Sequence, residues 1–219
     1  YPNNPAGTIM DRASLEKVAA FAKAHDLIVI ADEIYCDLTY EGQHTCFASL
    51  PDMQERTIVL NGFSKSYAMT GLRIGYVCAP REALEEIYKV HQYEILCAST
   101  TSQYGAIEAL RNCDDDVKAM YEEYAARREM IYQGLVDMGL TVFKPKGAFY
   151  IFPDISCTGM DEEEFCDRLL TEEKVGVVPG TCFGSQGKNH IRISYAASRE
   201  NIAEALKRMA RFVKKYKKA

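Results

Sequence analysis

Apolar and polar residues in the first third of the chain follow two kinds of spacing. Apolar residues recur at helical spacing in DRASLEKVAAFAKAHD and predict a helix over residues 11–26. The next stretch, LIVIADE at residues 27–33, is a continuous apolar run that ends in carboxylates, as is typical of a strand buried on both faces. TIVLNGFS (57–64) and LRIGYVCA (72–79) have the same character. Together these segments predict a largely parallel α/β sheet with helices.

From residue 81 onward the spacing becomes mainly helical. Helices are expected at 81–95, 99–112 and about 114–138. The later elements are two short strands around a Lys-Gly turn within 140–155, a helix near 161–173, strands at 175–180 and 190–196, and a closing helix from Ser198. We therefore expect residues 1–115 to form an α/β domain and residues 116–219 to form a small α+β domain.

Composition narrows the class of protein. The chain has 219 residues, of which 47% are hydrophobic, and this content predicts a substantial core. Its net charge of -5 offers no basic surface for nucleic acid. No apolar run is long enough to span a membrane and no signal pattern opens the sequence, so we expect a soluble, cytoplasmic protein. The eight cysteines contain no CxxC pair and indicate reduced thiols, with no metal site.

Two acidic and phenolic groups follow the first predicted strand. Asp32 is carried out of an apolar sheet to the edge where ligands of such sheets bind. A carboxylate there needs a cationic partner to stay ionised, although it also fits a cap that accepts backbone hydrogen bonds. Tyr35 would add a phenol to the same place. Taken alone, this stretch does not separate a structural role from a catalytic one.

Two basic residues are candidates for binding a phosphate and for forming a Schiff base. Lys65 follows the second strand in a loop rich in hydroxyl groups, and Arg73 begins the third. An isolated lysine is usually a solvated surface residue, but this set suits a phosphate, and the amine suits a Schiff base. Near the C-terminus, Arg192 alternates with Ile191 and Ile193 on a predicted strand. That pattern fits an ordinary half-exposed strand as well as a carboxylate-binding arginine.

Five motifs in order suggest a family. YPNNPAG, ADEIY, GFSKSYAMTGLRIGY, GAFYIFP and HIRISY run through the whole chain. Their order and separation resemble those of the fold-type I pyridoxal-phosphate enzymes, specifically the class I/II aminotransferases of the bacterial aspartate or aromatic type. Members of this family move an amino group from an L-amino acid to a 2-oxo acid.

The resemblance implies roles for the residues that match the motifs. Lys65 is similar to the lysine that forms a Schiff base with pyridoxal 5'-phosphate and moves a proton. Asp32 matches the carboxylate that keeps the pyridine nitrogen protonated. Arg73, with help from Ser64, matches the phosphate-binding arginine.

Three further residues are assigned in the same way. Asn4 and Tyr35 are similar to the pair that hydrogen-bonds the phenolic oxygen of the cofactor. Arg192 matches the arginine that grips the α-carboxylate of the substrate. Phe149 and Tyr150 follow a turn and are expected either to wall the substrate pocket or simply to pack. The resemblance also implies a homodimer.

Two departures from the family pattern change the picture. Residue 62 is Gly where many relatives carry a phosphate-binding serine. The family's chains are nearly twice as long, so this chain is expected to be their C-terminal part. Residues 1–115 would then be the C-terminal part of the cofactor-binding large domain and 116–219 the small domain. Such a chain could be inactive alone. The alternatives left open are a pyridoxal-phosphate-dependent β-lyase and a non-catalytic fragment without cofactor.

Overall fold

The computed structural model describes residues 1–218, and these form two compact units. Unit 1 consists of Tyr1–Pro2 and Ile9–Tyr121, and unit 2 consists of Asn3–Thr8 and the chain from Glu122. The division falls within a long helix, α4 (Asp114–Asp137), whose first turn contains the predicted domain boundary. Residue 219, where the second predicted domain ends, lies outside the described residues. That unit 1 corresponds to the family's large domain and unit 2 to its small domain stays a prediction.

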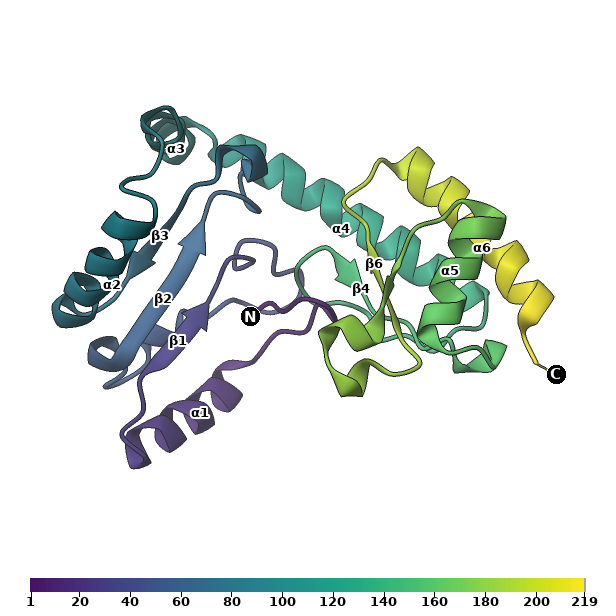
Figure 1. Cartoon of the computed structure of the whole chain (residues 1–219), viewed down its shortest axis with the longest axis horizontal. Coiled ribbons are helices and arrows are strands. Elements are labelled where there is room, and N and C mark those ends of the chain that lie inside the picture. The colour runs from purple at the N-terminus through teal and green to yellow at the C-terminus, as the bar shows by residue number, and fades with distance from the viewer. Residues whose placement is uncertain (219) are drawn as a thin grey trace. The chain divides into compact units, whose positions relative to one another are not determined.

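Unit 1 is built on a three-stranded sheet. Its strands are β1 (Val29–Asp32), β2 (Thr57–Gly62) and β3 (Gly75–Cys78), in the order β1-β2-β3 (Figure 1). β1 and β2 are parallel, as predicted, but β3 runs antiparallel to β2. The sequence predicted a largely parallel sheet, whereas the pairing is mixed, because the connection from β2 to β3 contains no α-helix of the kind that usually makes a parallel crossover. Residues 63–74 contain only a short 3-10 turn.

Helices pack against parts of this sheet. α1 (Arg12–Ala24) begins where the Asp11 carboxylate accepts the Ser14 N–H at 2.7 Å, a standard N-cap. Its buried face packs against a cluster that includes Phe47 and Met53. The other helices of this unit are α2 (Arg81–Glu94) and α3 (Thr100–Asn112). Two alanines of α3 pack against Phe63 at the end of the sheet.

The strand β1 is less buried than its sequence predicts. Val29 and Ala31 pack against the α1 cluster, whereas Ile28 and Ile30 are 70% and 66% exposed. Burial on both faces is therefore wrong for this strand within the described chain. The alternation follows from the pleat, which sends successive side chains to opposite faces.

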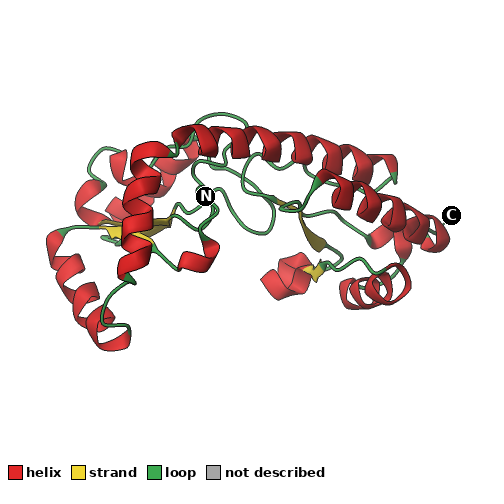
Figure 2. Cartoon of the chain, turned by 90° about the horizontal axis from the view of Figure 1, so that it is seen from above, coloured by secondary structure: helices red, strands yellow, loops and turns green. Residues whose placement is uncertain are grey.

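Unit 2 combines a second small sheet with three helices. Its strands β4 (Tyr150–Ile151), β5 (Val178–Pro179) and β6 (Ile191–Ser194) are antiparallel in the order β4-β6-β5. The first of the two strands predicted around the Lys-Gly turn is reduced to an isolated bridge, Thr141 to Asp154. The chain around these strands is mostly helical or loop, as Figure 2 shows.

Two capped helices complete unit 2. α5 (Glu162–Glu173) and α6 (Arg199–Tyr216) begin at Asp161 and Ser198, whose side chains accept backbone N–H groups three residues on. The two helices pack through the rings of Phe165 and Phe212, which are almost fully buried. Their positions agree with the helices predicted from the sequence. In the described part of the chain, no helix combines the length and the apolar character that crossing a membrane requires.

Gly62 gives a test of the β2–β3 pairing. A Cβ atom at this position would lie 2.8 Å from the Gly75 Cα and 3.0 Å from the Ile74 carbonyl oxygen. Both contacts are with backbone, which cannot move aside as a flexible side chain could. We expect Gly62→Ala to lower the free energy of unfolding by about 1–3 kcal/mol, measured by urea denaturation.

The matched control is Gly71→Ala, because a Cβ atom there meets nothing within 4 Å. This variant should stay within about 0.5 kcal/mol of the parent. Equal stabilities for the two variants would show that β2 and β3 do not approach as described. In this structure, the side chain of a serine at residue 62 would press against the same backbone atoms of β3.

Glu172 gives a test of the α5–α6 packing by pH. Hydrogen bonds from Lys215 and Tyr216, with Arg168 adding to them, lower the pKa of the Glu172 carboxyl from 4.5 to about 2. A lowered pKa stabilises the folded state above the ordinary value, and this stabilisation is lost as pH falls from 4.5 toward 2. Glu172→Gln should therefore flatten the acid side of the stability profile. Glu163→Gln, exposed on the same helix, should leave that slope unchanged; equal slopes for all three proteins would contradict the packing.

Candidate functional site

The register of the first sheet gathers three of the predicted residues at one edge. Because β1 and β2 are parallel, their carboxyl ends meet at the same edge. Asp32 ends β1, and Lys65 follows the end of β2. Gly62 lies opposite Gly75, the first residue of the antiparallel β3. Arg73, just before Gly75, therefore returns to that edge.

The Asp32 side chain caps the turn after β1. Its Oδ1 accepts the Ile34 N–H at 3.1 Å, and the residue is exposed. The structural role that the sequence left open is thus present. An aspartate that caps a turn with one oxygen still offers a second carboxylate oxygen to a ligand, since an ionised carboxylate has about four acceptor positions.

Glu33 is a residue of this edge that sequence reasoning missed. Its buried carboxylate accepts the Phe47 N–H at 2.8 Å through Oε1 and the His44 Nε2–H at 2.9 Å through Oε2. Burial by itself would raise the pKa of the Glu33 carboxyl, but the His44 and Phe47 hydrogen bonds lower it below its ordinary value. Glu33 thereby fastens the loop that follows Tyr35 onto the end of β1. The only signal in the sequence was a second carboxylate directly after a buried strand.

Tyr35 and Lys65 approach each other at this edge. The Lys65 Nζ lies 5.8 Å from the centroid of the buried Tyr35 ring, within the range of a cation–π contact. The neighbouring thiol is inert: burial, opposed by a hydrogen bond from the Asn61 amide, raises the pKa of Cys36 to about 11. At neutral pH this thiol stays protonated and is a poor nucleophile.

The loop that carries Lys65 has an unusual backbone. Ala68 and Arg73 both adopt left-handed conformations, with φ of 51° and 50°. The Phe63 carbonyl accepts the N–H groups of both Tyr67 and Met69, which folds the loop back on itself. Ser64 is half-buried in this loop. Such conformations are uncommon for residues other than Gly and tend to cluster at ligand-binding sites.

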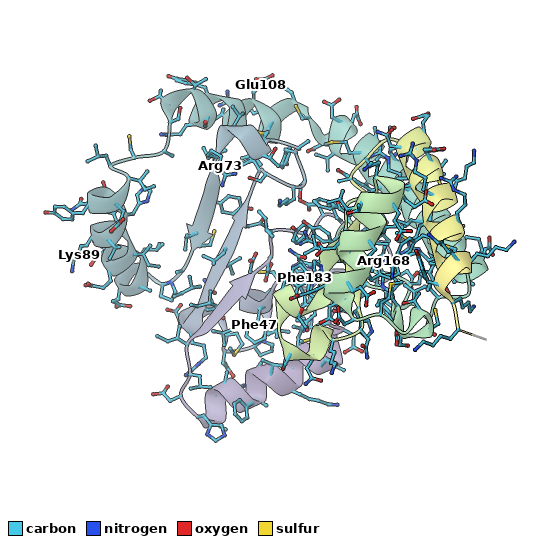
Figure 3. The ribbon with its side chains drawn as sticks, turned by 45° about the vertical axis from the view of Figure 1, so that its right-hand side comes forward. Phe47, Arg73, Lys89, Glu108, Arg168 and Phe183 are labelled. Carbon is cyan, nitrogen blue, oxygen red and sulfur yellow. The ribbon has the colours of Figure 1, made fainter. Side chains whose placement is uncertain are left out.

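The Arg73 guanidinium points outward from this loop. The side chain is exposed, and its Nη1 donates to the Thr70 carbonyl at 2.8 Å. Figure 3 labels Arg73 beside the turn that precedes β3. One hydrogen bond occupies one of five N–H donors, so the group keeps donors to offer to an anion.

Arg192 of β6 is held from three directions within unit 2. Its Nη1 donates to the Asn4 Oδ1 at 3.0 Å. The rings of Tyr150 and Phe183, the latter labelled in Figure 3, each lie 4.7 Å from its Cζ. Its Nε is buried and has no hydrogen-bond partner among residues 1–218. A guanidinium fixed between aromatic faces with a buried donor to satisfy is suited to binding a carboxylate.

Asn4 belongs to a closed turn of unit 2. The Asn3 Oδ1 accepts both the backbone N–H of Thr8, at 3.2 Å, and its hydroxyl, at 3.0 Å. The predicted residues fall into two sets: Asp32, Tyr35, Ser64, Lys65 and Arg73 lie in unit 1, and Asn4 and Arg192 lie in unit 2. The contact between Asn4 and Arg192 was not predicted, because the residues lie at opposite ends of the sequence.

Comparison with known proteins places the chain in a family. A family model described as aminotransferase class I and II matches residues 1–209. The chain belongs to the aminotransferase class I and II family. This finding confirms the resemblance drawn from the five motifs.

Individual members of the family resemble the chain over nearly all of its length. A putative aminotransferase, YugH, of Bacillus subtilis is 48% identical over 98% of this chain and 55% of the relative. An aspartate aminotransferase of Pyrococcus abyssi is 46% identical, over 99% and 56%. The crystal structure of an aromatic aminotransferase from Pyrococcus horikoshii has a TM-score of 0.95 and 45% identity, with 98% and 58% covered.

The chain thus spans about half the length of the family members it matches. Its assignment to the C-terminal part of the family's chain stays a prediction made from the order of the motifs. The α/β class of the fold agrees with that of these structures.

The contact between Asn4 and Arg192 predicts the effect of a charge change. Asn4→Asp would place a carboxylate at the 3.0 Å acceptor position of the guanidinium. We expect the free energy of unfolding at neutral pH to rise by about 0.5–1 kcal/mol, measured by urea denaturation and reduced by added salt. The gain should vanish in an Arg192→Met background. A gain of equal size in that background would show that Asn4 does not face Arg192.

Proposed function

We propose that the protein that carries this chain is a pyridoxal-phosphate-dependent aminotransferase, which transfers an amino group from an L-amino acid to a 2-oxo acid. One observation carries the proposal. In a chain of the aminotransferase family, Asp32 ends β1, Lys65 follows β2 and Arg73 precedes the antiparallel β3, so that all three belong to the same edge of the sheet.

The donor set of this edge fits pyridoxal phosphate. The cofactor has an aldehyde, a basic ring nitrogen, a phenolic oxygen and a phosphate. Lys65 supplies an amine for the aldehyde, Asp32 a carboxylate for the ring nitrogen, and Arg73 with Ser64 donors for the phosphate. When bound, the cofactor supplies a ring that draws electron density from the reacting carbon of the substrate.

The residues of unit 1 hold and move protons around that ring. The Asp32 carboxylate holds a proton on the ring nitrogen, because a negative charge beside it favours the protonated form. Tyr35 donates its phenolic hydrogen bond to the oxygen of the cofactor. The Lys65 Nζ takes the proton from the Cα of the substrate and returns it later in the cycle, as a positioned general base and acid.

The Asn4 side-chain amide can make two different hydrogen bonds, because it has an acceptor oxygen and a donor nitrogen. Its Oδ1 accepts from Arg192, so the amide is oriented with its Nδ2 as the remaining donor. We assign that donor to the phenolic oxygen of the cofactor. This assignment keeps the role that the motif implies and adds the contact with Arg192.

Arg192 binds the α-carboxylate of the substrate in this proposal. A bidentate contact needs the planar guanidinium to stay in one orientation, and the Tyr150 and Phe183 rings restrict it. Lysine would bind as a point charge and would lose both the fork and the ring contacts. Relatives named as aspartate and aromatic-amino-acid aminotransferases support an amino acid as donor, without fixing its side chain here. The homodimeric state and the cytoplasmic location stay predictions.

The test compares two lysines of unit 1 in the natural protein that carries this chain. Lys65 and Lys89 are replaced by Ala in turn; Lys89 is exposed on α2 and labelled in Figure 3. We expect Lys65→Ala to lower the rate of transamination by about 100- to 10,000-fold, the range for loss of a general base. Lys89→Ala should keep the parent rate.

A second readout does not depend on turnover. After incubation with pyridoxal phosphate and reduction with borohydride, mass spectrometry should find the cofactor's mass on the peptide that contains Lys65 and on none that contains Lys89. Labelling of other lysines in the Lys65→Ala protein at the parent level would contradict the proposal. So would the formation of pyruvate and ammonia from a cysteine conjugate without any amino transfer.

A further inference from the structure

We propose that Arg128 is a positioning residue for Arg192: it anchors a turn that holds Asn4 and Tyr150 against the carboxylate-binding guanidinium. The inference rests on the proposed function, because it takes Arg192 to be the group that binds the substrate carboxylate. All the contacts that carry it lie within unit 2.

The first link joins α4 to the turn before β4. Arg128 is only 6% exposed, and its Nη1 donates to the Pro145 carbonyl at 3.0 Å in a buried contact. Its Nη2 donates to the Glu129 Oε1 at 3.0 Å, which also lies 2.7 Å from the Lys144 Nζ. A buried guanidinium is costly unless its charge is paired and hydrogen-bonded. These contacts therefore hold the Pro145 carbonyl in one position.

The second link joins that turn to the Asn3–Thr8 turn. The Gly7 carbonyl accepts the N–H groups of both Lys146, at 2.8 Å, and Gly147, at 3.0 Å. Gly7 has a φ of +65°, and a Cβ atom there would lie 2.6 Å from the Pro145 Cβ. The two turns are thus in backbone contact at a place where only glycine fits. Movement of one turn must move the other.

The third link joins the Asn3–Thr8 turn to Arg192. The Gly7 N–H donates to the Asn3 carbonyl at 3.0 Å, and the Asn3 side chain closes the turn at Thr8. Asn4 lies inside this closed turn, with its Oδ1 against the Arg192 Nη1. The position of the Asn4 acceptor is therefore set by the same contacts that hold Gly7.

The same segment reaches Arg192 from a second side. Beyond Gly147, the Ala148 carbonyl accepts the buried hydroxyl of Tyr195 at 3.0 Å, and Tyr150 pairs with Ser194 across the sheet. The Tyr150 ring then lies 4.7 Å from the Arg192 Cζ. One short segment, anchored by Arg128, thus supports both the hydrogen-bond acceptor and one of the aromatic faces that hold the guanidinium.

The consequence is an arginine that is oriented before its ligand arrives. Carboxylate binding by a bidentate fork depends on the plane of the guanidinium, and a group already held in that plane loses less freedom on binding. Loosening of the anchor should weaken carboxylate binding while the proton-transfer groups of unit 1 stay unchanged. A purely structural arginine would instead alter stability alone.

The experiment uses Arg128→Met in the natural protein loaded with pyridoxal phosphate, with maleate as the carboxylate probe. Titration calorimetry should show a dissociation constant for maleate about 5- to 20-fold higher than in the parent. The KM of the amino donor should rise by a similar factor, whereas kcat should change by less than about threefold. Arg128→Lys, which keeps the charge and a donor, should recover part of the affinity.

The matched control is Arg208→Met. Arg208 also donates to a backbone carbonyl, that of Glu173 at 3.1 Å, and to a carboxylate of its own helix, but it contacts neither turn. This variant should bind maleate within about twofold of the parent. Weaker binding by the Arg208 and Arg128 variants alike, in step with lost stability, would overturn the proposal.

A double-mutant cycle tests whether Arg128 acts through Asn4. Asn4→Ala should weaken maleate binding in the parent but add less than about twofold in the Arg128→Met background. The proposal would be overturned if the fold-changes that the two single variants cause in the dissociation constant of maleate multiply in the double variant. Should Arg128→Met not fold, Asn3→Ala replaces it, since it opens the same turn without emptying the core. Unchanged maleate binding in that variant would overturn the proposal as well.

Failure of the proposed function has a different signature. If Arg192→Met binds maleate as well as the parent, then Arg192 is not the carboxylate-binding group and its assigned role is wrong. If Arg192→Met loses binding but Arg128→Met does not, the proposed function stands and only the positioning role is refuted.

Discussion

The parallel pairing of β1 with β2 is the constraint on which the candidate chemistry depends. In this register Asp32 lies opposite Leu60, so the carboxylate that ends one strand and the loop that follows the other meet at one edge. The close approach of Gly62 and Gly75 then turns the chain back and returns Arg73 to that edge. A shift of one residue in the pairing of β1 with β2 would send the Asp32 side chain to the opposite face of the sheet. The sheet thus acts as the frame for a carboxylate, an amine and a guanidinium that are far apart in sequence.

In unit 2, the arginine that we propose as the carboxylate-binding group is a partly buried cation held by neutral groups. Arg192 donates one hydrogen bond to Asn4 and lies against two aromatic faces, while its Nε has no partner in the described chain. These contacts restrict the group without neutralising it. A carboxylate partner in the protein itself would have stabilised the arginine more and would have made it useless as a receptor. The support comes instead from neutral groups whose positions are fixed by α4 and by the Gly7 contact.

The sequence predicted those features that depend on near neighbours. The helices at α1 and α5 were found because their apolar residues repeat at helical spacing within a few turns. The candidate residues themselves were found through motifs. The antiparallel direction of β3 and the roles of Glu33 and Arg128 were missed, because each depends on a partner that the local sequence does not reveal. The predicted burial of β1 on both faces was wrong. An apolar sequence shows that a strand can be buried on both faces, but the described residues cover only one face of β1.

The most direct test of the central claim is a crystal structure of the natural protein grown with pyridoxal phosphate and maleate. We expect continuous density from the Lys65 Nζ to the cofactor, with the Asp32 carboxylate at the ring nitrogen and Arg73 at the phosphate. We also expect a maleate carboxylate on the guanidinium of Arg192. A cofactor bound away from the edge that β1 and β2 share, or a maleate that leaves Arg192 untouched, would contradict this expectation.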